Sequence, residues 1–133
     1  KEEPTKYSYS DLVNDKKTVW DGVENNLALK HIRKILKGDD LLYYHTGKEK
    51  SIIGIAKVIR GSYSDPNKDD KKFAVFDIKP VKKLTRSVTL KEIKSNIFFN
   101  DFELVRIPRL SVMPVTKEYW SEIIKLSNKK YDV

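Results

Sequence analysis

The sequence predicts an α+β domain in which short helices flank a curled, largely antiparallel sheet. Apolar runs with the length and pattern of strands occupy the middle of the chain. Shorter segments with helical spacing and helix-capping residues lie before and after them. A chain of 133 residues without repeats or an internal linker has the size of one domain. We therefore expect a single domain over residues 1–133.

The first quarter of the chain carries two helix signals. Ser8 with Asp11 three residues later predicts a short helix at 9–14. After a turn at "WDGV", residues 25–36 show helical spacing, and Gly38 ends the segment. Its apolar face holds Ala28, Leu29, Ile32, Ile35 and Leu36, and its opposite face holds Lys30, Arg33, Lys34 and Lys37.

Strand signals follow this helix. The runs "DLLYYHT" and "SIIGIAKVIRG" flank the short turn "GKEK" and predict a β-hairpin. "SYSDPNKDD" is typical of a loop, and "KFAVFDIKPV" predicts a third strand. This strand places Phe73, Val75 and Asp77 on one face and Ala74, Phe76 and Ile78 on the other.

The last third of the chain predicts three more elements. Thr89 and Glu92 form a capping-box pattern that indicates one or two turns of helix in "TLKEIKS". "RLSVMPV" is interpreted as a last strand, and "TKEYWSEIIKLSNKK" as a closing helix from Thr116.

The composition favours an anionic partner. Lys and Arg number 27 against 19 acidic residues, which gives a net charge of +8 and a pI near 9.5. Nucleic acid is the commonest partner of such a protein, although a lysine-rich surface without a partner gives the same balance. The absence of cysteine excludes disulfides, zinc–thiolate sites and cysteine nucleophiles. Nothing in the sequence predicts a metal, a cofactor or a membrane span.

Trp20 is the first candidate for a binding site. It lies in the polar stretch "TVWDGVENN", where it either anchors a turn to the sheet or offers its indole face to a flat ligand. Trp120 lies in the closing helix beside Ile123, Ile124 and Leu126, which favours core packing.

Polar groups at the ends of predicted strands form the second set of candidates. In "YYHTG", His45 and Thr46 follow Tyr43 and Tyr44, which point to opposite faces so that one of them at most lines a given pocket. His45 either contacts a ligand, acts as a general base or caps its own turn. Arg109 and Ser111 share one face of the predicted last strand, and Glu2 or Glu3 is suited to accept from an exocyclic amine.

Basic residues are the candidates for phosphate contacts. The helical set is Lys30, Arg33 and Lys34, and the later set includes Lys82, Lys83 and Arg86. Such contacts bind a nucleic-acid backbone without sequence preference, and a solvated lysine face is the alternative.

Several blocks resemble the EVE domain family, that is, thymocyte nuclear protein and small bacterial proteins. They are "KEEP", "YSYSDL", "VWDGVENNLALKHI", "KGDDLLYYHTGKEKSIIGIAKV", "YSDP", "FDIKPVKKL", "VTLKEIK" and "LVRIPRLSVMPV", in the family's order and over nearly the whole chain. The resemblance implies a PUA-like fold, with a curled, β-barrel-like sheet related to YTH domains. It also implies a pocket for one extruded base, often a modified cytosine in DNA or a modified base in RNA, and a chain that lacks the first few residues of the domain.

The resemblance transfers residue by residue. Glu3, Pro4, Trp20 and its "DGV", Asn25, His45, Thr46, Tyr63 and the "RLSV" from Arg109 to Val112 match the family pattern. Glu2 replaces a serine and Glu24 replaces an arginine that are common in the family. The base-pocket residues implied in this way, together with candidates from the sequence, are Glu2, Glu3, Trp20, Asn25, Tyr44, His45, Thr46, Tyr63, Arg109 and Ser111.

The expected function is therefore a monomeric reader module that captures a flipped, modified base and has no catalytic activity. Three alternatives stay open: an RNA-binding module without modification preference, a sensor of a free base or nucleoside, and an enzyme that uses His45. The expected location is cytoplasmic in a bacterium and nuclear in a eukaryote.

Overall fold

The computed structural model describes residues 1–129 and contains one open four-stranded antiparallel sheet with the order β1-β4-β3-β2. The strands are β1 (Thr18–Trp20), β2 (Asp40–His45), β3 (Ser51–Ser64) and β4 (Ala74–Thr89). The helices are α1 (Tyr9–Asp15), α2 (Asn26–Ile32), α3 (Leu90–Lys94), the 3-10 turn η1 (Ile97–Phe99), α4 (Glu103–Arg106) and α5 (Lys117–Asn128). The α+β class is confirmed. The expectation of a curled, barrel-like sheet is wrong, because the sheet does not close: β1 and β2 remain at separate edges.

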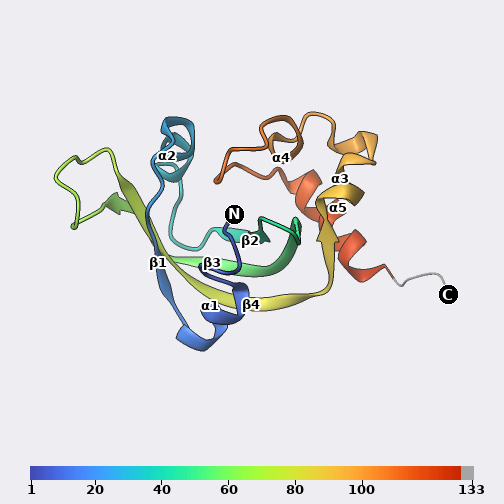
Figure 1. Cartoon of the computed structure of the whole chain (residues 1–133), viewed down its shortest axis with the longest axis horizontal. Helices are drawn as coiled ribbons and strands as arrows, with labels where there is room; N and C mark the ends of the chain where they lie inside the picture. The colour runs from blue at the N-terminus through green and yellow to red at the C-terminus, as the bar shows by residue number, and fades with distance from the viewer. Residues whose placement is uncertain (130–133) are drawn as a thin grey trace.

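Helices cover both faces of this sheet. Figure 1 shows α1 on one face, and α2, α4 and α5 on the other. The predicted caps form as expected: Ser8 and Asp11 make a reciprocal capping box at α1, and Thr89 and Glu92 make one at α3. Thr116 caps α5, which confirms the closing helix up to Asn128. Lys130 of the predicted helix lies outside the described residues.

The hairpin of β2 and β3 is confirmed, with His45 opposite Ser51 across the turn. The next strand is much longer than the sequence predicts. β4 continues through Pro80 to Thr89, and the register to β3 shifts between Ile55 and Ala56, next to Pro80. Because proline cannot donate to a ladder, it is tolerated in a sheet at such an irregularity, where a sequence pattern suggests a strand end. β3 also extends to Ser64, into the predicted loop.

Three further sequence predictions are corrected by the structure. Trp20 lies in β1 opposite Phe76 of β4, at the end of a short edge strand that the sequence interpretation missed. The helix predicted at 25–36 ends at Ile32 and continues as turns. Residues 109–115 alternate like a strand but have no strand partner, and they form a loop that begins in a turn at Arg109 and bends at Ser111 and Val112.

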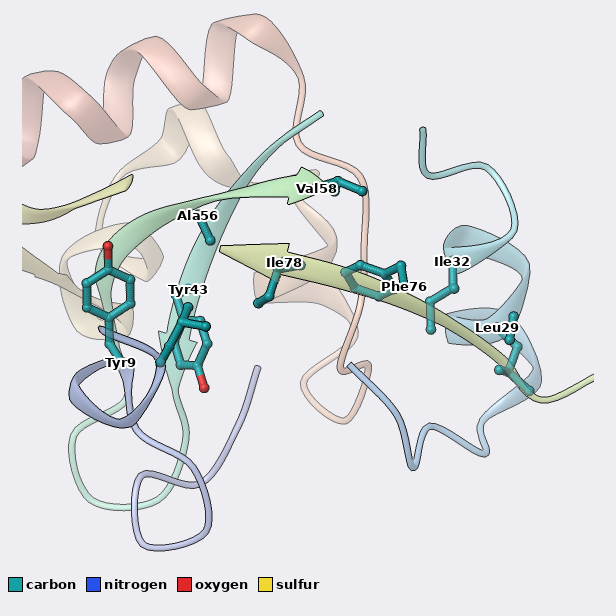
Figure 2. Close-up of a cluster of buried hydrophobic side chains, with 10 residues drawn as sticks. Tyr9, Leu29, Ile32, Tyr43, Ala56, Val58, Phe76 and Ile78 are labelled. Carbon is teal, nitrogen blue, oxygen red and sulfur yellow. The ribbon is translucent and has the colours of Figure 1, made fainter. Parts of the chain in front are cut away.

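Two hydrophobic cores lie along the sheet. The first core contains Tyr9, Leu12, Leu29, Ile32, Tyr43, Ala56, Val58, Ala74, Phe76 and Ile78 (Figure 2). The second core contains Tyr44, Ile52, Ile55, Leu84, Val88, Ile93, Phe99, Phe102, Leu104 and Ile123. β2, β3 and β4 contribute to both cores, and the neighbouring residues Tyr43 and Tyr44 belong to different ones.

One side chain ties the second core to the helices around it. Arg86 of β4 donates two hydrogen bonds to the Glu92 carboxylate of α3, at 2.7 and 2.8 Å, and one to the Leu126 carbonyl of α5 at 2.7 Å. These bonds are the largest cause that holds the pKa of Glu92 below its usual range. The sequence predicts that Arg86 contacts phosphate. In the structure its guanidinium instead joins β4 to α3 and α5.

We expect Gly54→Ala to destabilise the fold by about 1–3 kcal/mol, because overpacking a well-filled site forces side chains from their preferred positions. A methyl group at Gly54 would lie 2.5–2.7 Å from the Tyr9 ring. Urea denaturation measures the loss. In a Tyr9→Leu background the same substitution should cost much less, and an equal cost in both backgrounds would contradict this packing.

We expect Arg86→Ala to lower the free energy of unfolding by about 1–3 kcal/mol at neutral pH, because Glu92 and the Leu126 carbonyl lose their donor. The Glu92 pKa is lowered in the folded state, so its contribution is present above the ordinary value of 4.5 and disappears as the pH falls through the folded pKa. The difference between wild type and variant should therefore shrink in acid. Thermal melts against pH measure it, with Lys83→Ala as the exposed control within about 0.5 kcal/mol of wild type.

Candidate functional site

A cavity of about 820 Å³ lies between the two cores, on the face of the sheet that carries α2 and α5. Cavities of about 300–1,000 Å³ are typical of small-molecule sites. Its floor is formed by β2, with Phe76 and Ile78 of β4. Residues 31–39 form one wall, the loop 111–115 crosses opposite them, and the first turns of α5 close the other end. We call this space the central cavity.

Trp20 lines the central cavity from the end of β1. Its ring meets the Tyr43 ring edge-on, at 5.4 Å between centroids and 87° between planes. The Tyr43 hydroxyl donates to the Tyr7 carbonyl at 2.7 Å, and burial, the largest cause, raises its pKa. The Tyr43 hydroxyl therefore stays neutral, and the tyrosine fixes one side of the indole. Trp20 remains partly exposed.

The loop 111–115 forms the opposite wall because it is anchored at both ends. The main-chain nitrogen of Lys1 donates to the Ser111 carbonyl at 2.8 Å. Val112 packs against the first core, and Met113 and Val115 pack against the second. Ser111 thus lines the cavity as predicted, although from a loop rather than a strand.

The charged groups at the cavity leave a positive balance. Asp39 accepts from the Leu36 main-chain nitrogen at 2.9 Å, and Asp40 pairs with Lys57 at 3.4 Å. Lys1, Lys34 and Lys117 also line the cavity, and none of them makes an ion pair within residues 1–129. The Lys1 ammonium group donates to the Pro108 carbonyl at 2.6 Å, whereas Lys34 and Lys117 lie on opposite walls. Two cations are thus available to an anionic ligand, whereas both carboxylates are already engaged.

His45 supports the site from outside the cavity. Its side chain is buried, its Nε2 accepts from the Tyr9 main-chain nitrogen at 3.0 Å, and its Nδ1 lies 2.9 Å from the Glu49 carboxylate. This pattern requires the neutral ring to carry its proton on Nδ1. His45 also packs edge-on against Tyr43, which in turn contacts Trp20. Both ring nitrogens are thus used inside the protein.

The N-terminal segment runs beside the end of β2. The Glu2 main chain donates to the Tyr44 carbonyl and accepts from Thr46, both at 2.9 Å. The Glu3 carboxylate lies against Gly47 in the hairpin turn, where the φ of +77° favours glycine. Glu2, Glu3 and Thr46 therefore brace the strand end, and they are absent from the lining of the central cavity.

The remaining predicted residues lie apart from the cavity. Asn25 caps α2, and its Oδ1 accepts from the Ala28 nitrogen at 3.0 Å. Tyr63 donates to Asp77, and its ring stacks under Arg60 at 3.6 Å. Arg109 is exposed outside the cavity lining. The structure thus gathers Trp20, Tyr44 and Ser111 at the cavity, and leaves the other seven base-pocket candidates around it.

Of the predicted phosphate contacts, Lys34 alone lines the central cavity. Lys30 and Arg33 are exposed on and after α2, and Arg33 donates to the Lys72 carbonyl at 3.3 Å. Lys82 and Lys83 line a separate hollow of about 490 Å³ beside α1.

Sequence reasoning missed a second tryptophan at the site. Trp120 lines the central cavity from α5, together with Lys117 and Ser121. Their spacing of three and four residues places them on one face of the helix, and this was the available signal. His31 also lines the cavity and is half-buried.

Two other features are absent from the described residues. Among the residues described, 1–129, no group of three or more His, Asp or Glu side chains is arranged to hold a metal ion. The same part of the chain contains no helix long and apolar enough to cross a membrane.

Comparison with solved structures identifies close structural relatives. A protein from Rhodopseudomonas palustris superposes with a TM-score of 0.89 at 38% identity, over 95% of this chain and 88% of the relative. Human THYN1, solved in complex with 5-methylcytosine-containing DNA, superposes with a TM-score of 0.85 at 26% identity, over 94% of this chain and 88% of that one.

Comparison of sequences gives the same relationship. Human thymocyte nuclear protein 1 is 27% identical over 150 residues, which covers 94% of this chain and 67% of the relative. Across the vertebrate thymocyte nuclear proteins that match, the chain spans between 58% and 67% of their length. The family model described as the EVE domain matches residues 1–126. The chain belongs to the EVE domain family and is homologous to thymocyte nuclear protein 1.

Proposed function

We propose that this domain binds nucleic acid by accepting one flipped, modified base in the central cavity, with modified cytosine in DNA as the first candidate. The central cavity is the observation that carries the proposal, because it combines the indole of Trp20 with two lysines that make no ion pair among the described residues. The complex of human THYN1 with 5-methylcytosine-containing DNA supports the choice of ligand.

The cavity supplies the groups that this capture needs. A base that leaves the stack loses a few kcal/mol, and stacking on an aromatic side chain returns about 1–3 kcal/mol. In this proposal Trp20 offers that surface, and Lys34 and Lys117, which line the same cavity, contact the flanking phosphates. Hydroxyl groups such as that of Ser111 give the base edge a hydrogen-bonding partner.

Preference for a modified base is expected to be modest. A buried methyl group contributes about 0.8 kcal/mol, or roughly a four-fold difference in affinity. A polar modification gains more only if it makes its own hydrogen bond. Measured preferences therefore need matched oligonucleotides at one salt concentration.

A binding role without catalysis is part of the proposal. Both ring nitrogens of His45 are hydrogen-bonded inside the protein, which favours a structural role over a general base. The alternatives of RNA binding without modification preference and of a free base or nucleoside as ligand remain, and the next experiment separates them.

We expect Trp20→Ala to weaken binding of modified oligonucleotides by about five-fold or more and to abolish the preference over plain bases, because the stacking surface is lost. Fluorescence anisotropy against cytosine, 5-methylcytosine, 5-hydroxymethylcytosine, adenine and N6-methyladenine, each in DNA and in RNA, measures both effects. The control is Val19→Ala, an exposed neighbour on the same strand.

Three outcomes separate the alternatives. Equal binding of every oligonucleotide, unchanged in Trp20→Ala, would contradict a base site in the cavity. Tighter binding of all RNA oligonucleotides, irrespective of modification, would favour the RNA module. Affinity for a free nucleoside that is insensitive to salt, without oligonucleotide binding, would favour the sensor, since backbone contacts weaken steeply as salt rises.

We expect His45→Ala to lower the free energy of unfolding by about 1–3 kcal/mol, because the buried Tyr9 nitrogen loses its acceptor. His45→Gln should restore part of this loss, since its amide oxygen can accept the same bond. Thermal melts measure both variants. Loss of oligonucleotide binding by a fully stable His45→Gln protein would instead indicate that His45 contacts the ligand.

A further inference from the structure

The central cavity has two aromatic ends that belong to different cores. Trp20, with Ile35 and Val112, packs against the first core. Trp120, with Met113 and Val115, packs against the second. β2 spans this division: Tyr43 belongs to the first core and Tyr44 to the second, the β2–β3 register shifts between them, and both line the cavity. The sequence interpretation that one tyrosine at most faces the site is therefore wrong.

One base does not account for both ends. The volume of about 820 Å³ lies in the upper part of the range for sites that enclose drug-sized ligands, which are several times larger than a nucleobase. Trp20 can stack on one planar ring, and the wall around Trp120 then remains without a ligand contact.

The Trp120 end is suited to stack on the face of a base, and it offers few polar groups to hydrogen-bond the edge of a base. Its walls are apolar, with Tyr44, Ile52, Phe102, Leu104, Met113 and Val115 around the indole, and Met113 can adapt its shape to different ligands. Its polar groups are Lys117 and Ser121, on the exposed side of α5, and Lys1, whose Nζ lies 5.5 Å from the centre of the Tyr44 ring. A surface of this kind accepts any base, because every base presents a π-face.

We propose that the Trp120 end of the central cavity is a second subsite, which stacks the base adjacent to the captured one on a single strand, without reading its identity. The recognised unit is then a dinucleotide: one base at Trp20, its neighbour at Trp120, and the linking phosphate near Lys34 and Lys117. The proposal rests on the proposed function and specifies its ligand. Because a duplex must release two stacked bases to fill both ends, single strands should bind more tightly.

Abasic oligonucleotides test this with the wild-type protein. A short single strand with one modified cytosine is compared with strands that carry an abasic site directly 5′, directly 3′, or four nucleotides away. One of the two adjacent abasic strands should bind about five-fold to one-hundred-fold more weakly, the loss expected for one stacked base. The distant abasic strand should bind like the intact one. Equal binding of all four strands would overturn the proposal.

Intrinsic fluorescence locates the second base. The chain has two tryptophans, and both line the central cavity, so each single-tryptophan variant reports one end. In Trp20→Phe, the remaining Trp120 should be quenched by the intact strand and should recover when the neighbouring base is abasic. Quenching of Trp120 that does not depend on the neighbouring base would overturn the assignment of this subsite.

A variant of the subsite gives an independent measurement. Trp120→Leu should reduce affinity for the intact strand to that for the adjacent abasic strand, and should leave the preference for the modified base unchanged. Circular dichroism verifies the fold of the variant, and the abasic series decides the question if the variant fails to fold. Failure of the proposed function gives a different result from failure of this second subsite. If the proposed function fails, wild type itself shows no preference for the modified base.

Discussion

The pairing of β3 with β4 is the constraint on which the rest of the structure depends. These strands, of 14 and 16 residues, occupy the middle of the sheet and continue past the reach of β1 and β2. Their register shifts at four places, including the one next to Pro80, so that one antiparallel pair supports two separate cores. A straight pair of half this length would hold a single core. The central cavity exists because α2 packs on the first core and α5 on the second, with space left between them.

The polar groups that support the site lie outside the cavity, and the cavity lining itself is mainly apolar. His45, Glu2 and Thr46 make hydrogen bonds that hold the end of β2 and the N-terminal segment together. The Tyr43 ring packs edge-on against both His45 and Trp20, so it connects these hydrogen-bonded groups to the indole. The lining of the cavity is mainly aromatic and aliphatic, and its free charges are lysines. This division fits the proposed function, in which the apolar walls contact the rings of the ligand and the cations contact its backbone.

The family motifs therefore have different physical meanings. Trp20 and Ser111 line the cavity, whereas Asn25 caps a helix, Tyr63 bonds Asp77, and Glu3 fills the space beside Gly47. The residues that match the family pattern thus include residues that stabilise the fold as well as residues that line the cavity. The basic residues show the same distinction, because Arg86 joins β4 to α3 and α5, and Lys34 faces the cavity.

Local signals in the sequence determined the capped helices, the β2–β3 hairpin and the α+β class, because caps, turns and periodicity involve residues that are close in the chain. The sequence also indicated Trp20 as a site residue. The tertiary structure alone decided that β4 runs on past Pro80, that residues 111–115 form a cavity wall instead of part of a strand, and that Trp120 shares a cavity with Trp20. Each of these depends on contacts between distant segments, and no local pattern records which partner a segment meets. Residues 109–115, for example, alternate like a strand, but they lie beside no free sheet edge with which they could form hydrogen bonds.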